Sequence, residues 1–228
     1  MKKSVLIAVT LISFVFAGSV YAESSAKNRG DNWMMVGLSP LGASVQTLLA
    51  QPLTVAFLLG ERLMVGAEAG QASDSKFGNS YSNNKFDSSN AEESETNVRG
   101  TYIDSGAYVR FFLVDSSFNF RLAQNKRTWV GTGELKKSSG TAKADMEFTA
   151  LVSSIGFGNQ WLFDKGFVIG FDYYVNSRLT NSSVNYTILS NTGIPQNELE
   201  TEIEEFGEFL NNVSALPSVA VLTIGFVF

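Results

Sequence analysis

The chain alternates apolar side chains with small or polar ones over most of its length, at a spacing of two residues. In the clearest stretch, Phe167, Ile169 and Phe171 alternate with small or polar neighbours. This spacing puts the two sets on opposite faces of a β-strand. It predicts strands over eight segments: Trp33–Ala43, Leu53–Leu59, Leu63–Gln71, Val98–Val114, Phe118–Gly133, Met146–Trp161, Phe167–Ser177 and Ala215–Phe228.

The face opposite the apolar one is unusually rich in Gly, Ala and Ser. A soluble antiparallel sheet also alternates, but its second face is solvated and carries Lys, Glu and Thr. Small residues with sparse charges instead suit the narrow inside of a small barrel. The alternation fails around Gln124 to Arg127, which indicates either a bulge or a strand that has already left the apolar zone.

The connections between these segments alternate in length. Tight turns are predicted at Gly60–Arg62, Asp115–Ser117 and Phe163–Gly166. Longer polar links are predicted at Thr47–Pro52, Ala72–Asn97, Leu135–Asp145 and Arg178–Ser214. Short turns on one side and long loops on the other are typical of bacterial outer-membrane barrels. We therefore predict an all-β fold, an eight-stranded antiparallel up-and-down transmembrane β-barrel.

The last strand carries an apolar face that continues to the terminal aromatic residue. Five residues form the predicted C-terminal assembly signal: Leu222, Ile224, Gly225, Phe226 and Phe228. With this strand and the rhythm of turns and loops, the chain resembles the small eight-stranded outer-membrane barrels of the OmpA transmembrane-domain and OmpX type. The resemblance implies contact with the barrel-assembly machinery during biogenesis, and with outer-membrane lipid and lipopolysaccharide afterwards. Members differ in function, so the fold alone does not decide it.

The first residues have the pattern of a secretory signal peptide. Lys2 and Lys3 precede an apolar run over Val5–Phe16, and small residues lead to Ala22. We predict cleavage after about Ala22, a short N-terminal segment over 23–31 and a barrel over 32–228. An uncleaved membrane anchor is the alternative, but it would need about 20 apolar residues.

Composition excludes several classes of function. The chain carries 17 Lys and Arg against 22 Asp and Glu, a net charge of −5, which argues against a nucleic-acid partner. The absence of cysteine excludes disulfides and thiolate metal sites. The absence of histidine excludes a His-based triad or dyad. No nucleophile motif, metal constellation or phosphate loop is found, so we predict a non-enzymatic monomer without cofactors.

Several polar and charged residues fall on the predicted inner face. This barrel-interior network comprises Glu68, Tyr102, Asp104, Tyr108, Arg110, Arg121, Asp172 and Tyr174. Buried charges are tolerated when they are paired and hydrogen-bonded. We interpret the set as a structural network that fills a closed interior. A narrow gated pore or a small-ligand pocket lined by the same residues is the functional alternative.

Aromatic residues gather near the predicted short-turn end of the strands. An aromatic girdle at the inner headgroup level is predicted for Trp33, Phe118, Trp161, Phe163 and Phe167. Packing inside a core is the alternative for any one of them.

Two of the long links are rich in polar and acidic residues. The link Ala72–Asn97 consists mainly of Ser, Asn, Gly and acidic side chains. In Asn197–Leu210 four apolar residues share one helical face, and Asn197 with Glu200 resembles a capping box. A short acidic helix over the barrel mouth is one hypothesis, and an unstructured acidic loop is the other.

The leading functional prediction is a structural or surface-interaction role in the bacterial outer membrane, through long acidic extracellular loops that contact an extracellular partner. A small-solute channel is the alternative. A soluble ligand-binding β-barrel comes third.

Overall fold

The computed structural model describes residues 22–43, 52–74, 95–113 and 116–228. The predicted signal peptide and most of the links Thr47–Pro52 and Ala72–Asn97 lie outside these residues. The described elements are α2 (Ala22–Asp31), β1 (Met34–Ala43), β2 (Leu53–Leu59), β3 (Leu63–Asp74), β4 (Glu95–Phe112), β5 (Phe118–Lys137), β6 (Gly140–Leu162), β7 (Phe167–Thr192), α5 (Gln196–Ser214) and β8 (Ser218–Val227). None of the described helices is both long and apolar enough to cross a membrane.

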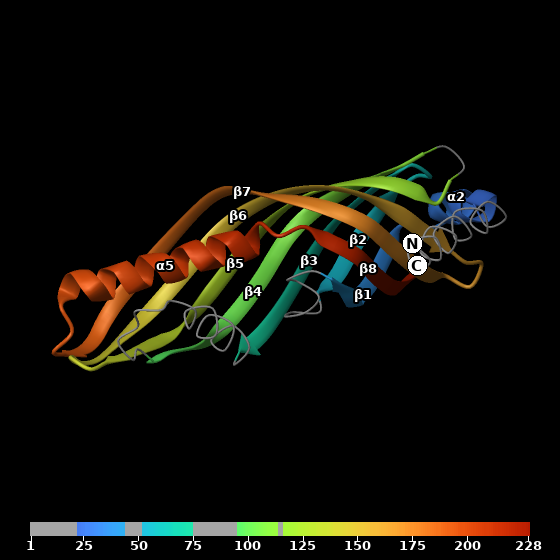
Figure 1. Cartoon of the computed structure of the whole chain (residues 1–228). Helices are drawn as coiled ribbons and strands as arrows, with labels where there is room; N and C mark the ends of the chain where they lie inside the picture. Colours follow the sequence, from blue (N-terminus) through green and yellow to red (C-terminus); the bar gives the residue numbers. More distant parts are fainter. Residues whose placement is uncertain (1–21, 44–51, 75–94, 114–115) are drawn as a thin grey trace, which may run out of the picture.

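The eight strands form one closed antiparallel barrel in which each strand pairs with its neighbours in the sequence (Figure 1). The ring closes where β1 meets β8, and Val36 pairs there with Phe226. The backbone N–H of Trp33 also donates to the carbonyl of Phe228 at 2.9 Å. The predicted eight-stranded up-and-down β-barrel fold is therefore confirmed.

The strands differ greatly in length, from 7 residues in β2 to 26 in β7. Strand β8 pairs with β7 only between Phe167 and Val175, whereas β6 pairs with β7 as far as Thr192. Strands β4 to β7 therefore continue well past the closed ring, and α5 lies along this extension (Figure 1). We call the extended parts of β4–β7 together with α5 the upper lobe.

The upper lobe corrects two of the predicted links. Leu135–Asp145 consists of the ends of two long strands joined by a two-residue turn, because β5 runs to Lys137 and β6 begins at Gly140. Much of the link Arg178–Ser214 is the continuation of β7, followed by α5. These strands bury apolar side chains against α5, while most of their outward residues are polar, so their overall composition resembles that of loops.

Strand β5 is continuous through the stretch where the alternation seemed to fail. It pairs with β4 and β6 without a register shift, so of the two interpretations of the stretch Gln124 to Arg127 the bulge is wrong. Asn125 and Arg127 are buried, while Gln124 and Lys126 are exposed. Polar residues on both faces, rather than a change of direction, interrupt the apolar pattern here.

Strand β7 is irregular instead: its pairing with β6 shifts register at three places, near Leu189, near Thr180, and at Tyr173 and Tyr174 inside the ring. Phe157 pairs with Tyr174 and the next residue of β6 pairs with Asp172, so β7 carries one extra residue there. The insertion reverses the parity of the strand. Tyr174 is consequently 40% exposed on the outside, and its prediction as an interior residue is wrong. Val175 turns inward and is buried.

The hypothesis of a helix over Asn197–Leu210 is confirmed, and α5 extends beyond it at both ends. The N-cap position is Pro195 and no side chain caps the helix, so the predicted capping box is wrong. Its apolar face is buried, and a Cβ on Gly207 would lie 2.7 Å from Val184 Cγ2 of β7. The glycine that weakens the helix in isolation thus allows its close approach to the sheet.

The buried apolar residues form two separate cores. One lies in the upper lobe and joins β4, β5 and β6 to α5, with Trp129, Phe148 and Ile203 among its members. The other lies low in the ring and contains Met64 and Phe112. The polar residues predicted for the interior mostly lie between them.

Candidate functional site

Large apolar side chains are exposed all around the ring. Leu122, for example, is 57% exposed on the outer face of β5. The outward apolar residues of the ring strands include Leu38, Leu53, Val55, Phe57, Leu59, Val65, Val109, Phe111, Leu113, Phe120, Leu122, Ile155, Phe157, Ile224 and Phe226. Soluble monomers rarely expose so large a contiguous apolar surface. We call this surface the apolar band.

The predicted girdle residues lie at the short-turn end of the band. Trp33 stacks on Phe57 with ring centroids 6.1 Å apart. Phe167 contacts both Phe163, at 6.0 Å, and Phe226, at 5.5 Å. Outward-facing Phe118 and half-buried Trp161 belong to the same end of β5 and β6.

The residues of β8 alternate between the outside and the inside of the ring, as predicted from the sequence. Ile224, Phe226 and Phe228 are exposed, Leu222 is half-buried, and Gly225 is buried beside β1. Its recognition as an assembly signal stays a prediction.

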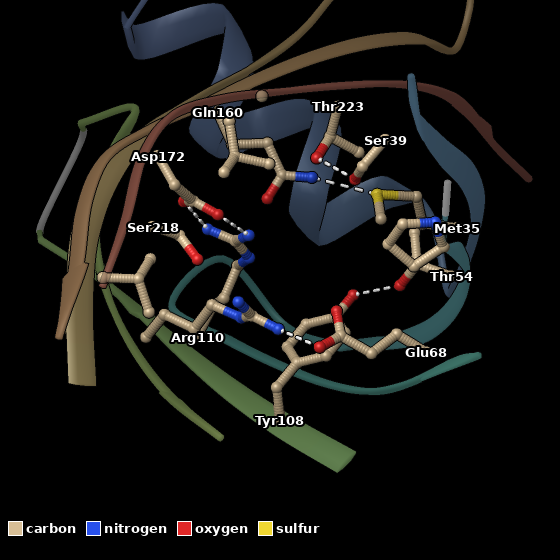
Figure 2. A pocket seen from close by; sticks show the side chains of 15 residues that line it. Met35, Ser39, Thr54, Glu68, Tyr108, Arg110, Gln160, Asp172, Ser218 and Thr223 are labelled. Atoms are coloured by element: carbon tan, nitrogen blue, oxygen red, sulfur yellow. Dashed lines mark hydrogen bonds and ion pairs between the residues drawn. The ribbon is translucent and has the colours of Figure 1, made fainter. Parts of the chain in front are cut away.

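Inside the ring, Arg110 and Asp172 form a fully buried ion pair. Two guanidinium nitrogens of Arg110 donate to the two carboxylate oxygens of Asp172 at 2.6 and 2.7 Å (Figure 2). The same guanidinium donates to Asn119 Oδ1 at 2.8 Å. Bidentate, charge-assisted pairing of this kind fixes both side chains in one geometry.

Two further ion pairs continue upward from this one. Arg121 donates to Glu68 at 2.6 Å, and Arg127 donates to Asp104 at 2.9 Å. The amide of Asn125 bridges the two carboxylates, donating to Glu68 at 3.0 Å and to Asp104 at 2.7 Å. The three buried cations are thus matched by three buried carboxylates.

The upper end of this network reaches the helix of the upper lobe. Arg127 Nη1 donates to the carbonyl of Ser214 at the end of α5. A cation there also faces the negative end of the helix dipole. The sequence prediction missed Asn125 and Arg127, although counting the period of two onward from Arg121 puts both inside.

Tyr108 lies between two of the arginines. Its ring centroid is 5.5 Å from Arg110 Cζ and 5.0 Å from Arg121 Cζ. Its hydroxyl is hydrogen-bonded to Thr54 Oγ1 at 2.8 Å (Figure 2). Tyr102, another of the three tyrosines predicted for the interior, is buried in the apolar core of the upper lobe.

A small polar cavity remains beside the network (Figure 2). Its lining includes Ser39, Glu68, Gln160, Asp172 and Thr223. Its volume is about 30 Å³, room for about two water molecules.

Helix α2 covers the short-turn end of the ring. Arg29 donates to the carbonyls of Glu61 and Ser116 at 2.7 and 2.8 Å, and lies 4.0 Å above the ring of Phe112. Burial lowers the pKa of Arg29 to about 10, although the Glu61 carboxylate partly offsets this effect. The guanidinium therefore stays charged at neutral pH. The predicted segment 23–31 thus ties two short turns together.

Helix α5 fills the inner side of the upper lobe. Phe206 packs edge-on against Trp129, with ring centroids 5.0 Å apart. Lys137 of β5 pairs with Glu198 at 3.0 Å and with Glu202 at 3.9 Å. Glu204 and Glu208, on the opposite side of the helix, are exposed.

The structural neighbours of this chain include two bacterial proteins. CarO of Acinetobacter baumannii superposes with a TM-score of 0.43 at 7% identity, covering 86% of this chain and 98% of that one. A major outer membrane protein from Thermus thermophilus gives a TM-score of 0.42 at 11% identity, with the same coverages. No family model and no curated protein matches the sequence.

Proposed function

We propose that the chain is a non-enzymatic β-barrel of the bacterial outer membrane with a structural and surface-interaction role. The ring spans the membrane, its interior is closed, and the upper lobe faces the outside of the cell. The extracellular partner meets the acidic, exposed side of α5. The observation that carries this proposal is a ring with an apolar outside and an inside filled by matched ion pairs.

The apolar band supports the membrane location. A closed barrel satisfies all its backbone hydrogen bonds internally, which is the condition for spanning hydrocarbon with strands. A soluble ligand-binding barrel would expose polar residues where Phe57, Phe111 and Leu122 are found. The soluble alternative is therefore the weakest of the three.

The filled interior favours a structural role over transport. Two of the ion pairs and the Tyr108 hydrogen bond join non-adjacent strands inside the ring, and the third pair joins the neighbouring β4 and β5. Helix α2 covers the short-turn end of the ring, and α5 packs into the upper lobe. An open channel would require several of these contacts to break together. Each broken pair would leave a buried charge uncompensated, at a cost of about 3–5 kcal/mol.

The closed interior is tested by planar-bilayer recordings on the refolded protein. Heat-modifiable migration on gels first establishes that the barrel is folded. We expect a heat-modifiable species with no single-channel steps. Repeated steps of uniform conductance would overturn the structural role in favour of the channel.

The surface-interaction role is tested by reversing charges on α5. Cells displaying Glu204→Lys with Glu208→Lys should bind a fluorescent oligolysine probe less than cells displaying the parent. The control, Asp31→Lys with Asp164→Lys, makes the same charge change at exposed residues of the short-turn end. Because that end faces the periplasm in our proposal, binding to intact cells should not change. Equal binding by all three would argue against the acidic face of α5 as the contact surface.

A further inference from the structure

Two basic side chains lie on the outside of the barrel just above the apolar band, on two strands that are separated only by β6. Lys126 of β5 and Arg178 of β7 are both exposed. Lys126 pairs across the sheet with Leu151 of β6, and Arg178 pairs with Ser153. Since Leu151 and Ser153 are successive outward residues of one strand, the two cations flank the same short stretch of β6.

The height of this pair follows from the length of a membrane crossing. A strand needs about 9–11 residues to span the hydrocarbon. Counted from Phe118, β5 reaches the upper boundary between Lys126 and Thr128. Counted from Trp161, β6 reaches it between Ser153 and Leu151. Counted from Phe167, β7 reaches it between Val175 and Ser177, and Arg178 is the next residue. All three strands therefore bring this patch to the level of the outer headgroups.

The surroundings of the pair are neutral and rich in hydrogen-bonding groups. Ser153 Oγ and Thr180 Oγ1 are 3.0 Å apart and exposed between the two cations. Within the described residues, neither Lys126 nor Arg178 forms an ion pair. The next outward carboxylate on β6 is Glu147, which pairs with Val130 farther up the lobe.

We propose that Lys126 and Arg178 bind the phosphate groups of a phosphorylated outer-leaflet lipid, a proposal that rests on the membrane location argued above. Basic residues at this level gain from attraction to anionic headgroups, and their apolar stems can lie along the band. Arg178 can grip a phosphate with two hydrogen bonds, and Lys126 adds a point charge. The hydroxyls of Ser153 and Thr180 supply further donors between them.

The test measures lipid retention by the full chain refolded in phosphatidylcholine vesicles that contain a small fraction of diphosphorylated lipid A. After extraction, bound lipid A is counted by native mass spectrometry. We expect the parent to retain lipid A, and Lys126→Gln with Arg178→Gln to retain about tenfold less. The control Lys143→Gln removes an outward lysine farther up β6, already 3.7 Å from Glu134, and should behave as the parent.

Two further measurements distinguish a failure of the lipid site from a failure of the membrane location. Dephosphorylated lipid A should not distinguish parent from variant, and about 1 M salt should weaken retention by the parent, because screening shortens the Debye length to about 3 Å. Equal retention by parent and variant, with both inserted and heat-modifiable, would overturn the lipid site alone. A parent that does not insert into vesicles at all would instead overturn the membrane location.

Discussion

Both side chains of the Arg110–Asp172 pair are buried, so neither charge can be solvated by water if the other is removed. Asp172→Leu should therefore lower the free energy of unfolding by about 3–5 kcal/mol, measured by urea titration of the refolded barrel. The matched control is the double variant Arg110→Met with Asp172→Leu, which removes both charges and should recover most of the loss. A single variant as stable as the double variant would contradict the pairing.

Gly66 allows Tyr108 to lie across the inside of the ring. A Cβ on Gly66 would lie 2.6 Å from Tyr108 Cζ and 2.8 Å from Ala56 Cβ. Gly66→Val should therefore displace the tyrosine from Thr54 and cost about 1–3 kcal/mol of stability. Ala67→Val is the control, since Ala67 is the next residue along β3 and faces outward. Similar losses for both variants would show that the inside is not packed as described.

At the scale of elements, the sequence predicted the strands and their order because the period of two survives in every ring strand. It could not predict the lengths of β5, β6 and β7. Their extensions bury an apolar face only against α5, and strand propensity says nothing about such a distant partner. The bulge at Tyr173 and Tyr174 was missed for a related reason. Two adjacent tyrosines suit either face, so the pairing with β6 and β8 decides which one points out.

Helix α5 shows most clearly which features of an element could be predicted from the sequence and which could not. Leu199, Ile203, Phe206 and Leu210 could be predicted to share a face, but not what covers that face. Their partners come from several strands and include Trp129, which lies at least 70 residues earlier in the sequence. The same holds for the interior network, where the charged residues could be predicted from parity but their pairing could not.

Removing one anchor of α5 should loosen the upper lobe and leave the ring intact. Phe206→Ala deletes the ring that packs on Trp129 and should cost about 3–5 kcal/mol within the lobe. We expect faster proteolysis in α5 and a change in tryptophan fluorescence, with heat-modifiability unchanged. Glu204→Ala, on the exposed side of the same helix, is the control. If Phe206→Ala also abolished heat-modifiability, the lobe and the ring would be a single cooperative unit.

At the scale of the whole molecule, the position of a residue along the barrel axis decides how much a charge costs there. Phe171 and Asn176 both face outward on β7, Phe171 within the apolar band and Asn176 at its upper boundary. An arginine in mid-membrane on the lipid face costs about 2–4 kcal/mol, and one near the interface about 0–1 kcal/mol. Phe171→Arg should therefore destabilise the barrel in vesicles far more than Asn176→Arg. Detergent micelles hold the charge near water and should reduce the difference. Because a soluble barrel would tolerate both arginines equally, equal losses in vesicles would contradict a membrane-spanning ring.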